Sequence, residues 1–239
     1  MRPEVTEIWV YLSESPLLWL TVTLIAYVGA ERVSVHFKRN PLANPVVIAA
    51  TLLVGLLVVT KTPYGAYFDG AQFVHFLLGP ATVALAVPLY RNIGTVKKSL
   101  LPMAAALLAG SVTAAVSAVA IAWALGAPPA VLASLAPKSA TAPIAMELAR
   151  NLGGIASLAA VLVILTGIIG AVVVTPLMNG LGIKDFAARG FAAGVASHGI
   201  GTARAFQVSE LAGTFAGIAM GLNGALTSLI VLLWIVLAG

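Results

Sequence analysis

The chain has 239 residues, of which 60% are hydrophobic and 9% charged, and its mean hydropathy is +1.04. These values exclude an ordinary soluble domain and indicate an integral membrane protein. The absence of cysteine excludes disulfides and thiolate metal sites, and the net charge of +5 comes from basic residues scattered at segment ends, which argues against a nucleic-acid partner.

The first half of the sequence contains four apolar elements. They are predicted at about Pro16 to Val33, Asn44 to Thr60, Ala71 to Tyr90 and Leu100 to Leu125. The third contains Gly79-Pro80, and we predict a kink or break there because proline removes a backbone hydrogen bond. Basic residues between positions 32 and 39 and between 91 and 98 predict that these two loops face the cytoplasm.

The second half follows Gly126-Ala127-Pro128-Pro129, the clearest turn signal in the chain. Its apolar elements are predicted at Val131 to Leu148, Ile155 to Met178, Ala187 to Val208 and Leu211 to Ala238. In both halves a broken segment precedes a long span, which favours two structural repeats, residues 16–125 and 130–239, within a single integral membrane domain. The sequence thus predicts an all-α polytopic membrane protein with about seven or eight membrane elements, including broken or re-entrant helices.

The topology of the second half has two solutions. If Val131 to Leu148 spans the bilayer, Lys184 and Arg189 emerge outside, against the positive-inside tendency. If it is a re-entrant hairpin, these residues lie inside and the two halves become inverted repeats. The charge bias favours the hairpin only weakly, because Asp185 adds a charge of opposite sign.

The first polar break combines a cation, hydroxyl groups and helix-breaking prolines. Pro137 and Pro143 bracket Lys138, Ser139 and Thr141. Because proline is tolerated in the first helical turn, Pro143 can open a short helix whose free N–H groups attract an anion. Together with the ammonium, this end would suit a small carboxylate. The alternative is a loop whose lysine reaches the lipid headgroups.

The second polar break combines glycines with a planar cation. Gly199 and Gly201 allow close approach of the backbone, Arg204 offers a fork that matches a carboxylate, and His198 and Thr202 add polar groups. Alternatively, the glycines pack helices, Arg204 is a cytoplasmic charge that ends a span, and His198 is hydrogen-bonded between helices.

Two further polar residues are candidates for coupling or support. Glu147 could pair with Lys138 or Arg204 or bind a proton, although its spacing from Arg150 also predicts a local ion pair. Thr82 follows Gly79-Pro80 and is the first-half counterpart of the breaks, unless that string is only a kink.

Signatures of enzymes are missing from the sequence. The three histidines lack metal-ligand spacing, and neither a P-loop nor a Gly-x-Ser-x-Gly elbow is present. We therefore predict that the protein is not an enzyme and has neither a metal nor another cofactor.

Two long strings resemble the LrgB/CidB family of bacterial membrane proteins. They are Lys138-Ser139-Ala140-Thr141-Ala142-Pro143-Ile144-Ala145 and Ser197-His198-Gly199-Ile200-Gly201-Thr202-Ala203-Arg204-Ala205. Asn44-Pro45 and the segment from Gly79 to Tyr90 support the match, which extends from about Asn40 to the C-terminus. The related plastid members are glycolate/glycerate translocators.

The resemblance implies one of two functions. The first is secondary transport of small monocarboxylates such as glycolate, glycerate or pyruvate; the alternative is antiholin-like or holin-like control of murein hydrolase activity and cell lysis. It also implies a multi-pass location in the inner (plasma) membrane, a small LrgA/CidA-type membrane partner and a homo- or hetero-oligomer. In the family this partner is a separate chain in bacteria and a fused, preceding domain in the plastid members. We expect no such domain in this chain, which then transports either alone or together with the partner.

The sequence and the resemblance together predict where a small organic anion binds. We expect the two breaks to meet near the middle of the bilayer, with Lys138 and Arg204 holding a carboxylate between helix ends and one bundle moving against the other. The predicted binding residues are Lys138, Ser139, Thr141, His198, Gly199, Gly201, Thr202 and Arg204. If the protein instead forms a pore, the breaks are packing devices.

Overall fold

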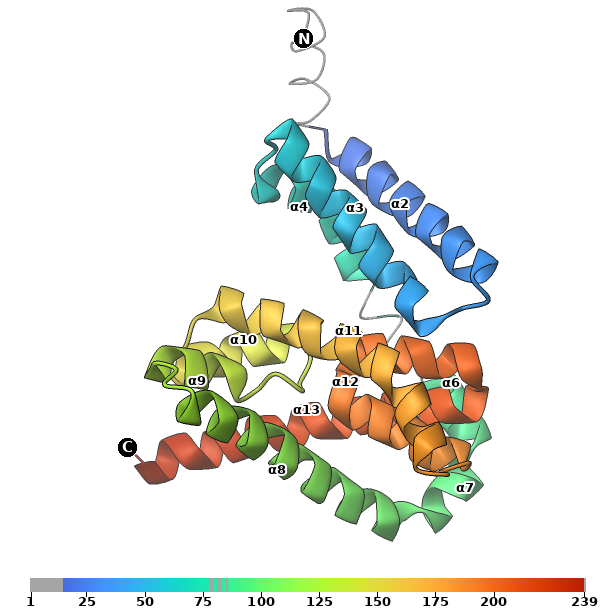
Figure 1. Ribbon diagram of the computed structural model, residues 1–239, viewed down its shortest axis with the longest axis vertical. Helices are drawn as coiled ribbons and strands as arrows, with labels where there is room; N and C mark the ends of the chain where they lie inside the picture. Colours follow the sequence, from blue (N-terminus) through green and yellow to red (C-terminus); the bar gives the residue numbers. More distant parts are fainter. Residues whose placement is uncertain (1–14, 78–79, 81–82, 85, 239) are drawn as a thin grey trace, which may run out of the picture. The chain divides into compact units, whose positions relative to one another are not determined.

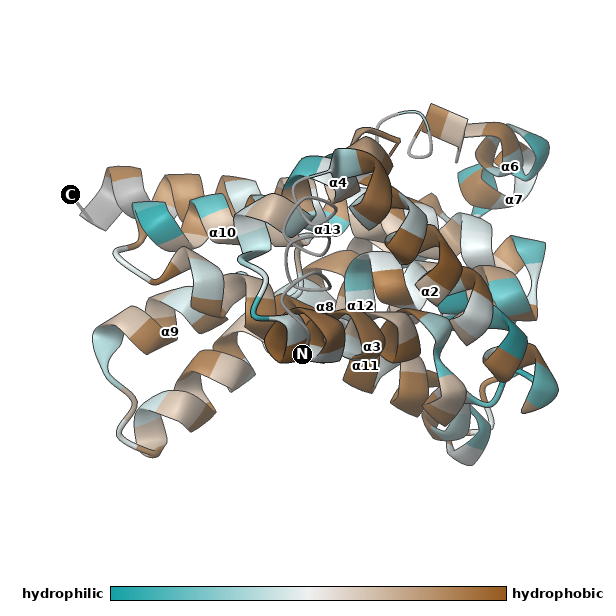
Figure 2. Cartoon of the chain, turned by 90° about the horizontal axis from the view of Figure 1, so that it is seen from above, coloured by the Kyte–Doolittle hydropathy of each residue, from teal (hydrophilic) through white to brown (hydrophobic). Residues whose placement is uncertain are grey.

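The computed structural model describes residues 15–238 except 78–79, 81–82 and 85, and within this part of the chain every regular element is a helix. The chain divides into two compact units, residues 1–86 and 87–239 (Figure 1). Large apolar side chains remain exposed along the helices of both units, as expected for surfaces that face lipid (Figure 2).

In the part of the first unit that the structure describes there are three α-helices and one 3₁₀-helix. They are α2 (Pro16–His36), η1 (Pro41–Ala43), α3 (Pro45–Thr60) and α4 (Tyr64–Phe76). Helix α3 begins where Asn44 caps it, its side chain accepting the N–H groups of Val46 and Val47 at 2.9 and 3.4 Å. Helix α2 packs against α3 and α4, and its Trp19 ring meets the edge of Tyr67 at 5.8 Å between centroids.

The second unit contains three long helices and several short or broken ones. In chain order these are α6 (Ala86–Arg91), α7 (Ile93–Lys98), α8 (Leu100–Ala124), α9 (Pro129–Leu135), α10 (Ala142–Asn151), α11 (Ala156–Gly180), α12 (Phe186–Val208) and α13 (Glu210–Ala238). Among the described residues of the whole chain, four helices are long and apolar enough to cross a membrane: α2, α8, α11 and α13.

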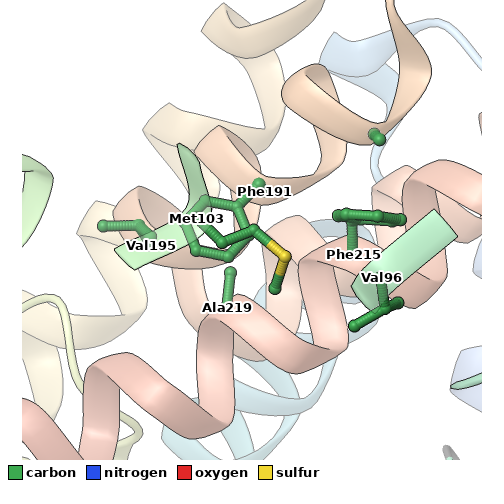
Figure 3. Close-up of a cluster of buried hydrophobic side chains, with 7 residues drawn as sticks. Val96, Met103, Phe191, Val195, Phe215 and Ala219 are labelled. Atoms are coloured by element: carbon green, nitrogen blue, oxygen red, sulfur yellow. The ribbon is translucent and has the colours of Figure 1, made fainter. Parts of the chain in front are cut away.

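A small apolar cluster holds α7, α8, α12 and α13 together. Figure 3 shows Met103 of α8 beside Phe191 and Val195 of α12, with Phe215 and Ala219 of α13 completing the contact. All of these side chains are buried. The cluster fixes α12 between α8 and α13, and this position brings the second polar break into the centre of the unit.

The predicted all-α class is confirmed, and the predicted bounds of the long spans agree with the structure to within a few residues. The third predicted element differs, because α4 already begins at Tyr64 and ends at Phe76, and the next described helix, α6, begins at Ala86. Gly79 and Thr82 lie outside the described residues, so the predicted kink and the predicted role of Thr82 stay predictions.

Candidate functional site

The first polar break lies at the tip of a segment that we call re-entrant because it enters and leaves the helical unit at the same end. Helices α9 and α10 are only seven and ten residues long, and Ser134 of α9 accepts the N–H of Ile155, next to the start of α11, at 2.7 Å. In Figure 1 the end of α8, both short helices and the start of α11 lie at the same end of the unit. The segment therefore enters and leaves at one end, and residues 136–141 form its inner tip.

The second polar break is a sharp reversal inside α12. His198 has φ 40° and ψ −133°, a conformation that a non-glycine residue adopts only where its surroundings impose it. The preceding half of α12 runs parallel to α13, with Gly190 against Ala212 and Gly194 against Ala216. The following half returns antiparallel to α13, with Phe206 against Gly213 and Thr202 near Met220. Helix α12 is thus a second re-entrant hairpin, with its tip at 197–199.

This hairpin also explains at which end of the unit the basic residues of the second half lie. Helix α12 begins and ends beside the start of α13, where Glu210 forms an ion pair with Arg91 at 3.7 Å. Residues 91–98 and 184–189 therefore lie at the same end of the unit. This arrangement agrees with the re-entrant solution and with the positive-inside tendency.

The two tips are joined by Asn223, a buried residue of α13. Its Nδ2 donates to the carbonyl oxygen of Ser139 at 2.9 Å and to that of Val195 at 3.3 Å. Its Oδ1 accepts a hydrogen bond from Ser111 of α8 at 2.6 Å. One amide therefore holds both tips and α8, and it satisfies a carbonyl at each break.

Sequence reasoning missed Asn223 and Ser111. The signal was available, because an asparagine in the middle of an otherwise apolar span is costly in lipid and requires partners. What the sequence did not contain was the identity of those partners, since two of them are backbone carbonyls exposed by the breaks.

Beside the tips, a cleft of about 440 Å³ runs between α11 and the first half of α12. Its polar side chains are Lys138, Thr166 and Ser197, and the remaining lining is apolar, with Ile169 and Val173 of α11 among it. Lys138 is partly exposed and its Nζ lies 3.4 Å from Ser139 Oγ. The described residues place no carboxylate within ion-pair distance of this ammonium.

Glycines of α11 allow the second tip to approach. A methyl group at Gly167 would lie 2.6 Å from His198 Cε1, and one at Gly170 would overlap the Ser197 side chain. These two glycines therefore form a notch that receives the reversal of α12.

His198 and Thr202 are used to build the second tip. The side chains of His198 and Thr202 are both buried. His198 Nε2 is 2.8 Å from the carbonyl oxygen of Val163. Thr202 Oγ1 donates to the carbonyl oxygen of His198 at 2.8 Å. The two glycines differ in the space around them. A methyl group at Gly201 would clash with Ser197 and Ala193, whereas one at Gly199 would make an ordinary contact with Met220 at 3.8 Å. The reversal therefore requires glycine at 201.

Arg204 lies in a different cleft from Lys138. It is in the returning half of α12, where it lines a small cleft together with Arg189, and its Nη1 donates to Gln207 at 3.2 Å. The structure therefore does not bring Lys138 and Arg204 into one pocket, because Arg204 follows the reversal by six residues. The two clefts adjoin, since Val174 and Ala193 line both of them.

The remaining predicted residues surround the first tip. Ser139 is buried and Thr141 is the N-cap of α10, where its side chain makes no capping hydrogen bond. Glu147 forms an ion pair with Arg150 at 3.1 Å, and both side chains are about 60% exposed. The local ion pair is thus the observed arrangement of Glu147, away from the Lys138 cleft.

The fold and the two re-entrant hairpins define a multi-pass membrane protein with broken helices that meet inside one unit. The chain belongs to the LrgB-like family, whose model matches residues 23–237. No solved structure matches the chain.

Relatives cover nearly the full length of the chain. The uncharacterized protein YwbG of Bacillus subtilis is 35% identical over 87% of this chain and 92% of its own. The holin-like protein CidB of Staphylococcus epidermidis is 30% identical over 90% and 93%, and the antiholin-like protein LrgB of Bacillus mycoides is 30% identical over 91% and 94%. These bacterial relatives and the four apolar helices confirm the predicted multi-pass membrane protein and are consistent with the inner membrane.

Proposed function

We propose that this protein is a holin-like or antiholin-like regulator of murein hydrolase activity and cell lysis. The support is that relatives which align over about nine tenths of both chains are named holin-like and antiholin-like proteins. In this role it works in the lipid bilayer with a small LrgA/CidA-type membrane protein, in a homo- or hetero-oligomer. This is the function that the comparisons favour.

A second candidate function, which we also propose, is secondary transport of small monocarboxylates such as glycolate, glycerate or pyruvate. The observation that carries it is the cleft beside Lys138, an ammonium inside the helical unit with no carboxylate partner in the described residues. A charged group at such depth is costly and is typical of a solute pathway.

The arrangement of the basic residues suggests a route for the anion. Lys138 lines the inner cleft, and Arg189 and Arg204 line the adjoining small cleft nearer the end of the unit. A solute that leaves one cleft meets the next along the wall that Val174 and Ala193 share. In this proposal Lys138 and Arg204 act in succession, in place of the simultaneous grip that the sequence predicted.

The other predicted residues have supporting roles in this proposal. Ser139, Thr141, Gly199 and Gly201 shape the tips, and His198 and Thr202 hold the second tip in its reversed conformation. Glu147 and Thr82 stay candidates for coupling. We further propose that the membrane domain has about seven or eight membrane elements arranged as two structural repeats. Neither candidate function includes a catalytic step, a metal or a cofactor.

Reconstitution separates the two candidate functions. The purified chain is placed in vesicles, with and without an LrgA-type partner, and uptake of labelled pyruvate and glycolate is measured alongside leakage of a small dye. A carrier gives saturable uptake that discriminates among acids and does not leak dye. A pore gives dye leakage without saturation. Uptake equal to that of protein-free vesicles would contradict the transport proposal and leave the regulatory one.

A further inference from the structure

We infer that Ser197 is a ligand-binding residue and that, with Lys138, it forms a site for a single-charged anion with a short apolar body. This inference rests on the proposed transport function, because the site would hold the transported solute. It is tested separately, by measuring the affinity of the chain for small anions. Ser197 belongs to neither the predicted site residues nor the network around Asn223.

The first observation is that the Ser197 hydroxyl is an exception in its surroundings. Only 1% of the residue is exposed, and within the described part of the chain its Oγ is buried without a hydrogen-bond partner. Other helical hydroxyls nearby satisfy themselves on the carbonyl one turn back, as Thr166 does on Leu162 at 2.7 Å and Thr202 on His198 at 2.8 Å. A buried polar group without a partner destabilises a protein, so its presence calls for a reason.

The second observation is the position of this hydroxyl. Ser197 lines the same cleft as Lys138, at the tip where α12 reverses. Gly170 lies directly opposite, and any side chain there would occupy the space beside the Ser197 oxygen. Glycine at 170 therefore lets the backbone of α11 pack directly against this hydroxyl without offering it a hydrogen bond.

The third observation is the charge balance of the cleft. Among the described residues that line the cleft, Lys138 contributes the one cationic group and none is acidic. A carboxylate that accepts one hydrogen bond from the ammonium and one from the Ser197 hydroxyl would neutralise the first and satisfy the second. A second negative charge would find only apolar neighbours such as Ile169, Val173 and Leu177, and an uncompensated charge is costly there.

This balance predicts the class of ligand. A monoanion with a small alkyl body places its charge between Lys138 and Ser197 and its body against the apolar wall. A dianion of similar length does not. Propionate and succinate are a matched pair of probes, because succinate is propionate with a second carboxylate in place of a methyl hydrogen.

The experiment measures binding of both acids to the full chain in lipid nanodiscs by isothermal titration. We expect propionate to bind at least tenfold more tightly than succinate. Ser197→Ala should weaken propionate binding by roughly tenfold or more, the usual loss for a hydrogen bond to a charged group. The matched control is Ser228→Ala, whose hydroxyl donates to Gly224 in α13 and lies outside this cleft.

A readout of stability separates ligand binding from a structural role. Since the Ser197 hydroxyl stabilises nothing in the protein itself, Ser197→Ala should leave the melting temperature unchanged or raise it. A variant that melts much lower would show a structural role and overturn the inference. So would unchanged propionate affinity in Ser197→Ala, equal affinity for succinate, or no binding of propionate to the unmodified chain.

The outcome also distinguishes this inference from the transport proposal. If propionate binds as expected but vesicles show no uptake, the site stands and transport fails. If the unmodified chain takes up monocarboxylates and Ser197→Ala binds and transports them equally well, the transport proposal stands and the proposed Ser197 site is wrong.

Discussion

The two re-entrant segments of the second unit reverse their direction inside the protein in different ways. The first is interrupted by an irregular stretch, residues 136–141, which contains Pro137, and it keeps Lys138 at its tip. The second reverses at a single residue, His198, without any proline, and its tip is buried in a glycine notch of α11. The comparison indicates that the first tip supplies the charge, whereas the second supplies a closely packed wall of the cleft.

The largest effect is expected at the charged tip. Lys138→Gln removes the cation but keeps a polar side chain of similar length. Uptake of a labelled monocarboxylate should fall roughly ten- to hundredfold, because the hydrogen bond to the ammonium is charge-assisted. Lys138→Arg, which keeps the charge, is the matched control and should retain more activity. Full uptake in Lys138→Gln would place the solute elsewhere.

The close packing of the first half of α12 against α13 is tested by adding one methyl group. At Gly194 this group would overlap the backbone of Ala216 in α13, so Gly194→Ala should lower the free energy of unfolding by about 1–3 kcal/mol. Gly221→Ala is the control, since a methyl group at that position in α13 meets nothing within 4 Å. The readout is the melting temperature in detergent. Equal melting of the two variants would contradict the close packing of α12 against α13.

The connection between the tips is tested at Asn223. Asn223→Asp keeps the acceptor for Ser111 but loses both hydrogen bonds to the tip carbonyls, while Ser111→Ala loses only the bond to α8. We expect Asn223→Asp to destabilise the protein by about 1–3 kcal/mol and Ser111→Ala by less. If thermal unfolding ranks the two variants in the opposite order, the amide does not hold the tips.

The smallest effect is expected at Arg204. Arg204 lies outside the Lys138 cleft, and Arg204→Lys keeps the charge of the adjoining cleft. The substitution should therefore change uptake by less than about threefold, which corresponds to less than about 1 kcal/mol. Concentration-dependent uptake of pyruvate measures this. A loss as large as that of Lys138→Gln would show that both cations grip the solute together, as the sequence predicted.

Much of this architecture could be predicted from the sequence. Hydropathy placed the long spans α8, α11 and α13, and Pro137, Pro143 and the glycines around 199 placed both breaks. These are local properties of the chain, so periodicity and helix-breaking residues are sufficient to find them.

The assembly of the site could not be predicted in the same way. Distance along the sequence did not indicate that α12 folds back at His198, so Arg204 was assigned to the same pocket as Lys138. The role of Asn223 depends on carbonyls from two distant segments, and the exceptional state of Ser197 depends on Gly170 in another helix. These are tertiary contacts between segments that are far apart in the sequence, so no local sequence pattern predicts them.

The central claim is that the two re-entrant tips meet inside the second unit. It is tested most directly by cross-linking, and the chain favours this approach because it contains no cysteine. A Lys138→Cys/Ser197→Cys double variant in membranes is treated with a short bifunctional thiol reagent, and cross-linked peptides are identified by mass spectrometry. We expect an efficient intramolecular cross-link for this pair and none for a Glu147→Cys/Ser197→Cys control. A cross-link in the control alone, or in neither variant, would contradict it.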